Sequence, residues 1–247
     1  MGEPEKRPAH GIQRVCWILL AAGWISTHAC ASQDAVQRRA DAETGAVAPA
    51  HALVVGKGSK RADLDRASAS RDVRHVADWV VDSGDNLNKP FVIVDKREAR
   101  VFVFDAKGKL RGKSSALLGL AIGDHSVPGI GDKKMSDIRP EERTTPAGRF
   151  VANLDKNLKG QEMLWVDYDT AISMHPVVAG HPRERRAERL ASLLPAERRI
   201  SYGCINIPAS FYKGVVSPAF AGTDGIVYVL PEVRSVKEVL GTYDVGE

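Results

Sequence analysis

Seven short runs of β-branched, aromatic and aliphatic residues lie between residues 91 and 230, and turn-forming residues separate them. The runs are FVIVD (91–95), RVFVFD (100–105), SALLGLAIG (115–123), RFVANL (149–154), MLWVDY (163–168), AISMH (171–175) and GIVYVL (225–230). Runs of this length and composition favour strands, because such side chains pack well on a pleated surface. We therefore expect a mainly β fold, with the strands in a sandwich or a barrel-like sheet.

Two segments carry the period of a short amphipathic helix. The first begins after Ser70, a candidate N-cap, and its apolar positions are Val73, Val76, Ala77 and Val80. The second lies between Pro182 and Pro195, and its apolar positions are Ala187, Leu190, Ala191 and Leu194. The second helix is thus inserted between His175 and Cys204, the two residues most capable of chemistry.

The first 31 residues have the layout of a secretory signal peptide. An uncharged, mostly apolar run at 15–27 follows basic residues, and the small-x-small site ACA follows at 29–31. An uncleaved anchor and a lipoprotein modified at Cys30 are the alternatives. The layout predicts an exported protein of the periplasm or cell envelope, which meets the membrane only through this segment.

Composition shifts divide the rest of the chain into three parts. Residues 32–60 are rich in Ala, Gly and small polar residues, which predicts a flexible spacer. Residues 61–88 hold the first predicted helix and form a short helical lead-in. Residues 89–247 hold the predicted strands and form the main domain. Within that domain, residues 123–146 are a long polar loop.

The chain has three cysteines, and two of them lie in the leader. If cleavage follows Ala31, Cys204 is the one cysteine of the mature chain, and no intramolecular disulfide can form. A lone thiol in an oxidising compartment invites oxidation and intermolecular pairing. Cys204 is therefore a candidate reactive thiol, with a buried inert cysteine as the alternative.

Charge and composition argue against several functional classes. The net charge is +4, and residues 183–199 alone contribute six Arg and three Glu, so the excess is local. Aromatic residues make up 6% of the chain, which disfavours an aromatic platform for nucleic acid. No His, Asp and Glu cluster has metal-ligand spacing, so we expect no metal and no cofactor.

A cysteine becomes a nucleophile when a base takes its proton, and histidine is the usual base. The chain beyond residue 31 has five histidines, at positions 51, 75, 125, 175 and 181. The first three are expected on the surface. His175 closes an apolar strand and precedes Pro176, which suits a side chain that faces a cleft. His181 is its competitor, with a helix-capping or solvated role as the alternative.

Acyl transfer also needs hydrogen-bond donors for an oxyanion. Gly203 lets the backbone bend sharply beside Cys204. The backbone N–H groups of Tyr202, Gly203 and Cys204 can then converge on one point and form an oxyanion hole. The alternative is that this stretch is a simple turn.

Three segments resemble one known family. SYGCIN (201–206) resembles the cysteine motif of L,D-transpeptidases with the YkuD-type catalytic domain. TTPAGRF (144–150) resembles a turn of the same family, and FVIVDKREARVFVFDAKGKL (91–110) resembles its opening hairpin. The resemblance spans about residues 89–232. It implies an L,D-transpeptidase-type β-sandwich or barrel-like fold and an L,D-transpeptidase-like catalytic domain over 89–247.

The resemblance also implies a mechanism. Cys204 is the nucleophile and His175 its base, in an enzyme that attacks peptidoglycan stem peptides and releases their terminal D-alanine. Ser201 and Asn206 hold substrate-binding positions, with Asn206 orienting its strand or the donor stem. An acceptor amine on another stem gives a 3→3 cross-link, an envelope protein gives anchoring, and water gives L,D-carboxypeptidase activity. A non-catalytic wall-binding module of the same fold is the other alternative.

Two features depart from the family pattern. Tyr202 stands where the motif usually has a histidine, so any role of that side chain is lost. The 29 residues from His175 to Cys204 are a longer separation than usual. The inserted Arg-rich helix takes up the excess, as a lid over the cleft or as a solvated surface helix.

Overall fold

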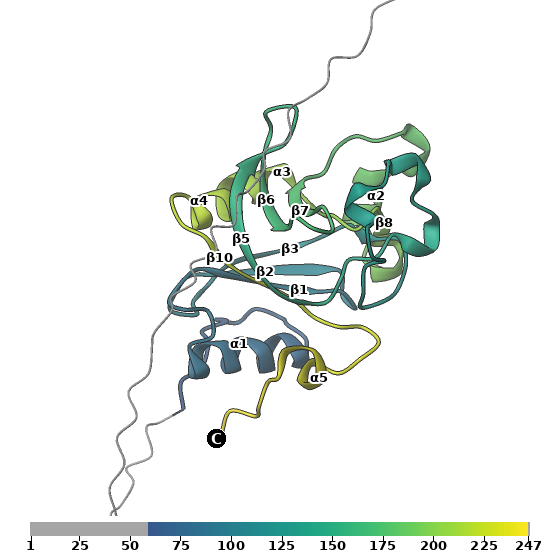
Figure 1. Cartoon of the computed structure of the whole chain (residues 1–247). Helices are drawn as coiled ribbons and strands as arrows, with labels where there is room; N and C mark the ends of the chain where they lie inside the picture. Colours follow the sequence, from purple (N-terminus) through teal and green to yellow (C-terminus); the bar gives the residue numbers. More distant parts are fainter. Residues whose placement is uncertain (1–58, 247) are drawn as a thin grey trace, which may run out of the picture. The chain divides into compact units, whose positions relative to one another are not determined.

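The computed structural model describes residues 59–246 and confirms the mainly β prediction (Figure 1). Its strands are β1 (Phe91–Asp95), β2 (Arg100–Phe104), β3 (Leu110–Ser115), β4 (Leu118–Gly119), β5 (Gly148–Lys156), β6 (Glu162–Asp167), β7 (Ile172–Pro176), β8 (Arg199–Ser201), β9 (Ile205–Ile207) and β10 (Gly225–Val229). Its α-helices are α1 (Arg71–Ser83), α2 (Arg186–Ala191), α3 (Ala209–Phe211), α4 (Ser217–Phe220) and α5 (Val236–Leu240). None of the helices in this part of the chain has the length and apolar character that a bilayer crossing requires.

Eight strands form one sheet in the order β3-β2-β1-β10-β5-β6-β7-β9, and β4 pairs with β8. Within the large sheet, β1 with β10 and β7 with β9 run parallel, and the other neighbours are antiparallel. Leu117, just after β3, exchanges backbone hydrogen bonds of 2.8 and 2.9 Å with Asn206 of β9. The two edges of the sheet are thus brought together and the sheet is nearly closed.

Alternation of side chains along the strands divides the core in two. In β1, Val92 and Val94 belong to a cluster with residues of β2, β6 and β9 and with the helical stretch 209–220. Phe91 and Ile93 point to the other face and pack with α1. Both faces of β1 are therefore covered, which explains why its sequence is an unbroken apolar run.

Helix α1 forms where the sequence predicts it. The Ser70 hydroxyl accepts a hydrogen bond from the Val73 N–H, and Gly84, with φ of 73°, ends the helix in the left-handed conformation. All four predicted apolar positions are fully buried against the sheet. The lead-in 61–88 therefore packs with the strands of residues 89–247 in one compact unit.

The strand prediction is wrong for four strands. The run 115–123 forms only the two-residue strand β4. Strand β3 was missed because LRGKSS is polar, which an edge strand tolerates. Strands β8 and β9 have three residues each, too few for a periodic signal.

A buried ion network lies beneath β8. The Lys96 ammonium is fully buried and contacts Asp124 at 2.9 Å, Glu232 at 3.6 Å and the carbonyl of Thr145 at 3.0 Å. Arg199 of β8 pairs with Glu232 from the other side. Burial raises the pKa of Asp124, but backbone N–H groups and Lys96 lower it more, so Asp124 is ionised. The network joins the end of β1, the polar loop and β8.

Candidate active site

The parallel strands β7 and β9 bring Cys204 and His175 together. Their register sets His175 opposite Asn206. Because side chains alternate along a strand, Ser173 shares one face with His175, and Cys204 shares that face with Asn206. The Ser173 hydroxyl lies 3.6 Å from the Cys204 sulfur, and the Asn206 amide lies 3.1 Å from His175 Nε2.

The Cys204 thiol is partly exposed and sits among polar groups. Its sulfur lies 3.6 Å from the carbonyl of Ala171 as well as from the Ser173 hydroxyl. Burial raises the pKa of this thiol, but the hydrogen bond and charge of His175, with hydrogen bonds from Ser173, outweigh burial. The pKa of Cys204 is therefore lower than that of an ordinary cysteine, which favours the nucleophilic thiolate.

His175 has a defined tautomer. Its Nδ1 lies 2.8 Å from the carbonyl of Pro176, which can only accept, so Nδ1 carries a proton. Its Nε2 is then the proton acceptor. Burial lowers the pKa of His175, but Cys204 and the Pro176 carbonyl raise it more, so the pKa is raised overall. Thiol and imidazole thus shift each other toward a thiolate–imidazolium pair.

The turn before Cys204 is held by buried hydroxyls. The Ser201 hydroxyl donates to the Cys204 carbonyl at 2.6 Å and accepts from the Gly203 N–H at 3.1 Å. The Thr145 hydroxyl donates to the Gly203 carbonyl at 2.7 Å. Thr145, from the segment TTPAGRF, is a positioning residue that our site prediction omitted, and the motif that contains it was the available signal.

These hydrogen bonds affect which groups are free to form the predicted oxyanion hole and to contact the substrate. The Gly203 N–H is bonded to Ser201, which leaves the N–H groups of Tyr202 and Cys204 as the candidate donors. Ser201 and Asn206 are 2% and 1% exposed, and both bond within the protein. Their side chains are thus bonded within the protein, and the predicted substrate contacts of both residues, like the oxyanion role, stay predictions.

Tyr202, which replaces the motif histidine, has a partner of its own. The Arg143 guanidinium lies 4.0 Å from the centre of the Tyr202 ring, in a cation–π contact. Arg143 also donates to the carbonyl of Ile138 in the polar loop. Through Arg143, the Tyr202 side chain thus connects the turn before Cys204 with the loop of residues 123–146.

The inserted helix is shorter than predicted, and its apolar stripe is not buried. Helix α2 has six residues, and Ala187, Ala191 and Leu194 are exposed. Arginines hold the segment instead: Arg189 donates to two backbone carbonyls, and Arg186 donates to the Asn206 side chain at 2.9 Å. Arg186 is a site residue that sequence reasoning missed, because only folding brings it beside Asn206.

The other histidines among residues 59–246 have surroundings of their own. His181 is exposed and accepts from the Arg183 N–H as the cap of a 3-10 turn, which is the capping alternative for that residue. His125 is exposed, as expected. His75 is half-buried and bonds Thr242 at 2.8 Å, so the surface expectation for His75 is wrong. His51 and the leader cysteines lie outside the described residues.

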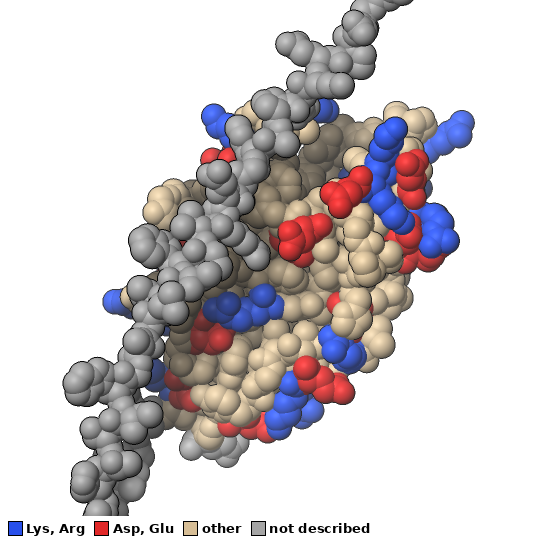
Figure 2. Space-filling model, viewed as in Figure 1, with Lys and Arg blue, Asp and Glu red and all other residues tan. Residues whose placement is uncertain are grey.

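Charges of both signs occur on the face of the molecule in Figure 2 and in the inserted segment. On the face in Figure 2, basic and acidic side chains are intermixed, including the upper right corner where Figure 1 draws α2. Within this segment Arg185 pairs with Glu188, and Arg186 pairs with Glu184. Among residues 59–246, no three His, Cys, Asp or Glu side chains are grouped so that they could hold a metal ion.

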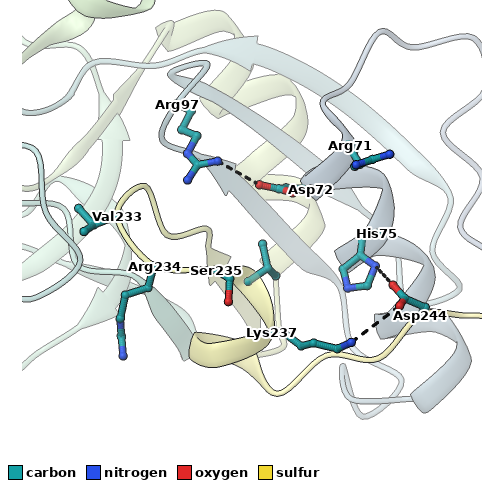
Figure 3. Close-up of a pocket in the computed structure, with 10 residues that line it drawn as sticks. Arg71, Asp72, His75, Arg97, Val233, Arg234, Ser235, Lys237 and Asp244 are labelled. Carbon is teal, nitrogen blue, oxygen red and sulfur yellow. Dashed lines mark ion pairs between the residues drawn. The ribbon is translucent and has the colours of Figure 1, made fainter.

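A groove of about 680 Å³ lies elsewhere, between α1, α5 and the C-terminal segment (Figure 3). Arg97 faces Asp72 in it, and His75 and Lys237 both point toward Asp244. The lining of this groove includes none of the residues around Cys204. Its volume alone therefore does not make it the active site.

Comparisons with known proteins find only distant likenesses. No protein-family model matches the sequence, and no curated protein matches it. A crystal structure of an L,D-transpeptidase (residues 123–326) from Xylanimonas cellulosilytica matches at 15% identity and a TM-score of 0.34, over 57% of this chain and 60% of that one. The helical cell shape determining protein Pgp2 from Campylobacter jejuni matches at 15% identity and a TM-score of 0.38, over 60% of this chain and 49% of that one.

A K307A mutant of Pgp2 matches at 14% identity and a TM-score of 0.38, over 68% of this chain and 58% of that one. This chain thus spans about half to three fifths of the length of these structures. Likenesses at such low identities and TM-scores do not assign an activity, so the function has to be inferred from the geometry around Cys204.

Proposed function

We propose that this chain is an exported cysteine transpeptidase of the L,D-transpeptidase type, acting on peptidoglycan stem peptides. The observation that carries the proposal is the pair of His175 in β7 and Cys204 immediately before the adjacent parallel strand β9, with a thiol pKa lowered by the imidazole. The order of the segments at 91–110, 144–150 and 201–206 supports the family assignment. Residues 1–31 would direct export, and residues 32–60 would link the leader to the domain.

The proposed reaction has two steps. Cys204 Sγ attacks the carbonyl carbon of the third residue of a tetrapeptide stem, and the thiol proton goes to His175 Nε2. The oxyanion accepts from the N–H groups of Tyr202 and Cys204. The tetrahedral intermediate collapses to a thioester, and the leaving D-alanine amine takes the proton from His175. An acceptor amine then attacks the thioester, gives up a proton to His175 and releases the thiolate.

A carbapenem tests the first step, because opening of its β-lactam ring acylates a reactive thiol of this family. We expect the intact mass of the protein to rise by one carbapenem, with the adduct on Cys204. Cys204→Ala should show no adduct, and His175→Ala a slow one. His125→Ala is the control, since His125 is exposed in the loop and the hydrogen bonds of the Cys204 sulfur go to Ser173 and Ala171.

Digestion of purified peptidoglycan, read as muropeptide masses, identifies the second step. New 3→3 cross-linked dimers support transpeptidation, and tripeptides without dimers support an L,D-carboxypeptidase. No adduct and unaltered tetrapeptides would contradict both and would favour a non-catalytic wall-binding module. The non-catalytic module stays an alternative because Tyr202 replaces the motif histidine.

A further inference from the structure

Arg186 is the first residue of α2, in the segment that lengthens the spacer between His175 and Cys204. Its Nη1 donates to Asn206 Oδ1 at 2.9 Å, and its Nε donates to Glu184 Oε2 at 2.6 Å. The Arg186 side chain is 14% exposed. The Arg186 guanidinium, from the inserted segment, thus contacts Asn206, and Asn206 in turn contacts the His175 imidazole.

This contact decides how the Asn206 amide is oriented. A guanidinium can only donate, so the atom that faces Arg186 must be the amide oxygen. The amide nitrogen then faces His175 and donates to Nε2 at 3.1 Å. Since Pro176 accepts the proton on Nδ1, both ring nitrogens are assigned, and Nε2 offers its lone pair.

The Arg186 side chain has little freedom to leave this position. Glu184 holds its guanidinium on one edge and Asn206 on the other. A Cβ added at Gly180 would lie 2.2 Å from Glu184 Oε2 and 2.8 Å from Arg186 Nε, so the strand exit packs closely on the ion pair. The absence of a side chain at residue 180 leaves room for the pair.

We propose that Arg186 is a positioning residue: it fixes the amide of Asn206, which donates to His175 Nε2 and so holds the ring in place with that nitrogen unprotonated before Cys204 reacts. Its catalytic meaning rests on the proposed function. The charged or titratable groups around the ring are the Cys204 thiol on one side and Arg186, with its partner Glu184, on the other. An amide donor at Nε2 and a nearby positive charge both oppose protonation of that nitrogen, and both depend on Arg186.

The test is an NMR titration of the His175 ring in the full chain, which needs no substrate. In Arg186→Met we expect the pKa of His175 to rise, because the positive charge is removed and the amide can turn its oxygen to Nε2. Arg186→Lys, which keeps the charge and a donor, should stay near the wild type. Arg185→Met is the matched control, because Arg185 has the same charge in the same segment but pairs with the exposed Glu188.

A double-mutant cycle asks whether Arg186 acts through Asn206. In an Asn206→Ala background, Arg186→Met should raise the pKa by less than it does in the wild type. If Arg186→Met does not fold, Arg186→Gln is the second variant, with the same expected direction. An unchanged or lowered pKa, or an equal rise in Arg185→Met, would overturn the inference.

The same variants separate this inference from the proposed function. Carbapenem acylation at neutral pH should slow by about tenfold to a hundredfold in Arg186→Met, because the base is misplaced. Slower acylation with an unchanged His175 pKa would overturn only the positioning role. A raised pKa in a protein that no carbapenem acylates would overturn only the proposed transferase.

Discussion

Gly203 is the residue whose backbone the site depends on most directly. Its φ of 131° is rarely adopted by other residues, and an added Cβ would lie 2.6 Å from Ile172 Cδ1 and 2.8 Å from the Thr144 carbonyl. We expect Gly203→Ala to lower the free energy of unfolding by about 2 kcal/mol or more, through strain and overpacking. Urea denaturation measures this loss, and alkylation of Cys204 by iodoacetamide should slow as well.

Gly222→Ala is the control for Gly203→Ala. Gly222 also has a positive φ, of 74°, but nothing lies within 4 Å of an added Cβ. We expect Gly222→Ala to lower the free energy of unfolding by about 1 kcal/mol, from the backbone conformation alone. Equal losses in the two variants would mean that close packing at Gly203 contributes nothing.

The thiol–imidazole pair predicts how the reactivity of Cys204 depends on pH. The pKa of Cys204 is lowered, so the thiolate, and with it iodoacetamide alkylation, persists to lower pH than for an ordinary cysteine. His175→Ala removes the strongest of the effects that oppose burial and leaves only those of Ser173, so the alkylation midpoint should move to higher pH. Acylation should fall by about 100- to 10,000-fold, the usual contribution of a general base.

His181→Ala is the comparison for His175→Ala, since His181 is the other histidine near the inserted segment. His181 caps a turn and is exposed, so its removal should leave the alkylation midpoint where it is. A midpoint that moves with His181 and not with His175 would reassign the base.

Among the structural elements, the polar loop of residues 123–146 is held in part by the carboxylate of Glu142, which titrates. Glu142 is buried and accepts from Lys133 at 2.7 Å and from the backbone and side chain of Arg139 at 3.0 and 3.1 Å. The hydrogen bond from Lys133, with those from Arg139, lowers the pKa of Glu142 to about 2. A lowered carboxyl pKa means that this support is complete above the ordinary glutamate range and is lost as pH falls toward 2.

Hydrogen exchange of the amides of residues 133–143, corrected for intrinsic rates, measures this support. We expect protection at pH 6 to decline on acidification in the wild type and to be already lost at pH 6 in Glu142→Gln. Glu141→Gln should behave as the wild type, because Glu141 is 64% exposed. Protection that is independent of pH in the wild type would refute the role of Glu142.

The inserted segment shows why an element can be predicted while its packing cannot. The spacing of Ala187, Leu190, Ala191 and Leu194 indicates a helix, and α2 does form there. The expected leucine stripe, however, lies mostly in solvent, and arginine hydrogen bonds hold the segment. Periodicity indicates which residues share a face, but the neighbours of that face come from elsewhere in the chain.

At the scale of the whole described unit, α1 is part of the core. Its buried side chains cover the face of the sheet that carries Phe91, Ile93 and Tyr228. Each fully buried valine contributes about 1.5–3 kcal/mol, whereas a domain's total stability is about 5–15 kcal/mol. We therefore expect a chain that starts at residue 89 to unfold or aggregate, and one that starts at residue 59 to fold.

Circular dichroism melts and gel filtration of the two truncated chains decide the point. A cooperative melt and a monomeric elution of the shorter chain would show that residues 61–88 are a separable lead-in.

Helices and strands were predicted best from the sequence where a local rule alone determines them. Ser70 caps a helix whose apolar face is complete, so the sequence predicts α1 with its N-terminal end. Strands β1, β2 and β10 are long apolar runs and were found as well. Strands β3, β8 and β9 were missed, since β3 is polar and the other two are short, and their pairing with distant strands is what stabilises them.

The amino-acid sequence is enough to identify the chemistry available to this protein: a cysteine after a glycine turn, a histidine before a proline and a mainly β chain. Which of these groups meet depends on how the strands and the insertion pack. The pairing of β7 with β9 sets His175 beside Cys204, and packing of the insertion sets Arg186 against Asn206. The physical reason is that the pKa of a thiol or an imidazole depends on burial and on charges a few ångströms away, and residues far apart in the chain supply both.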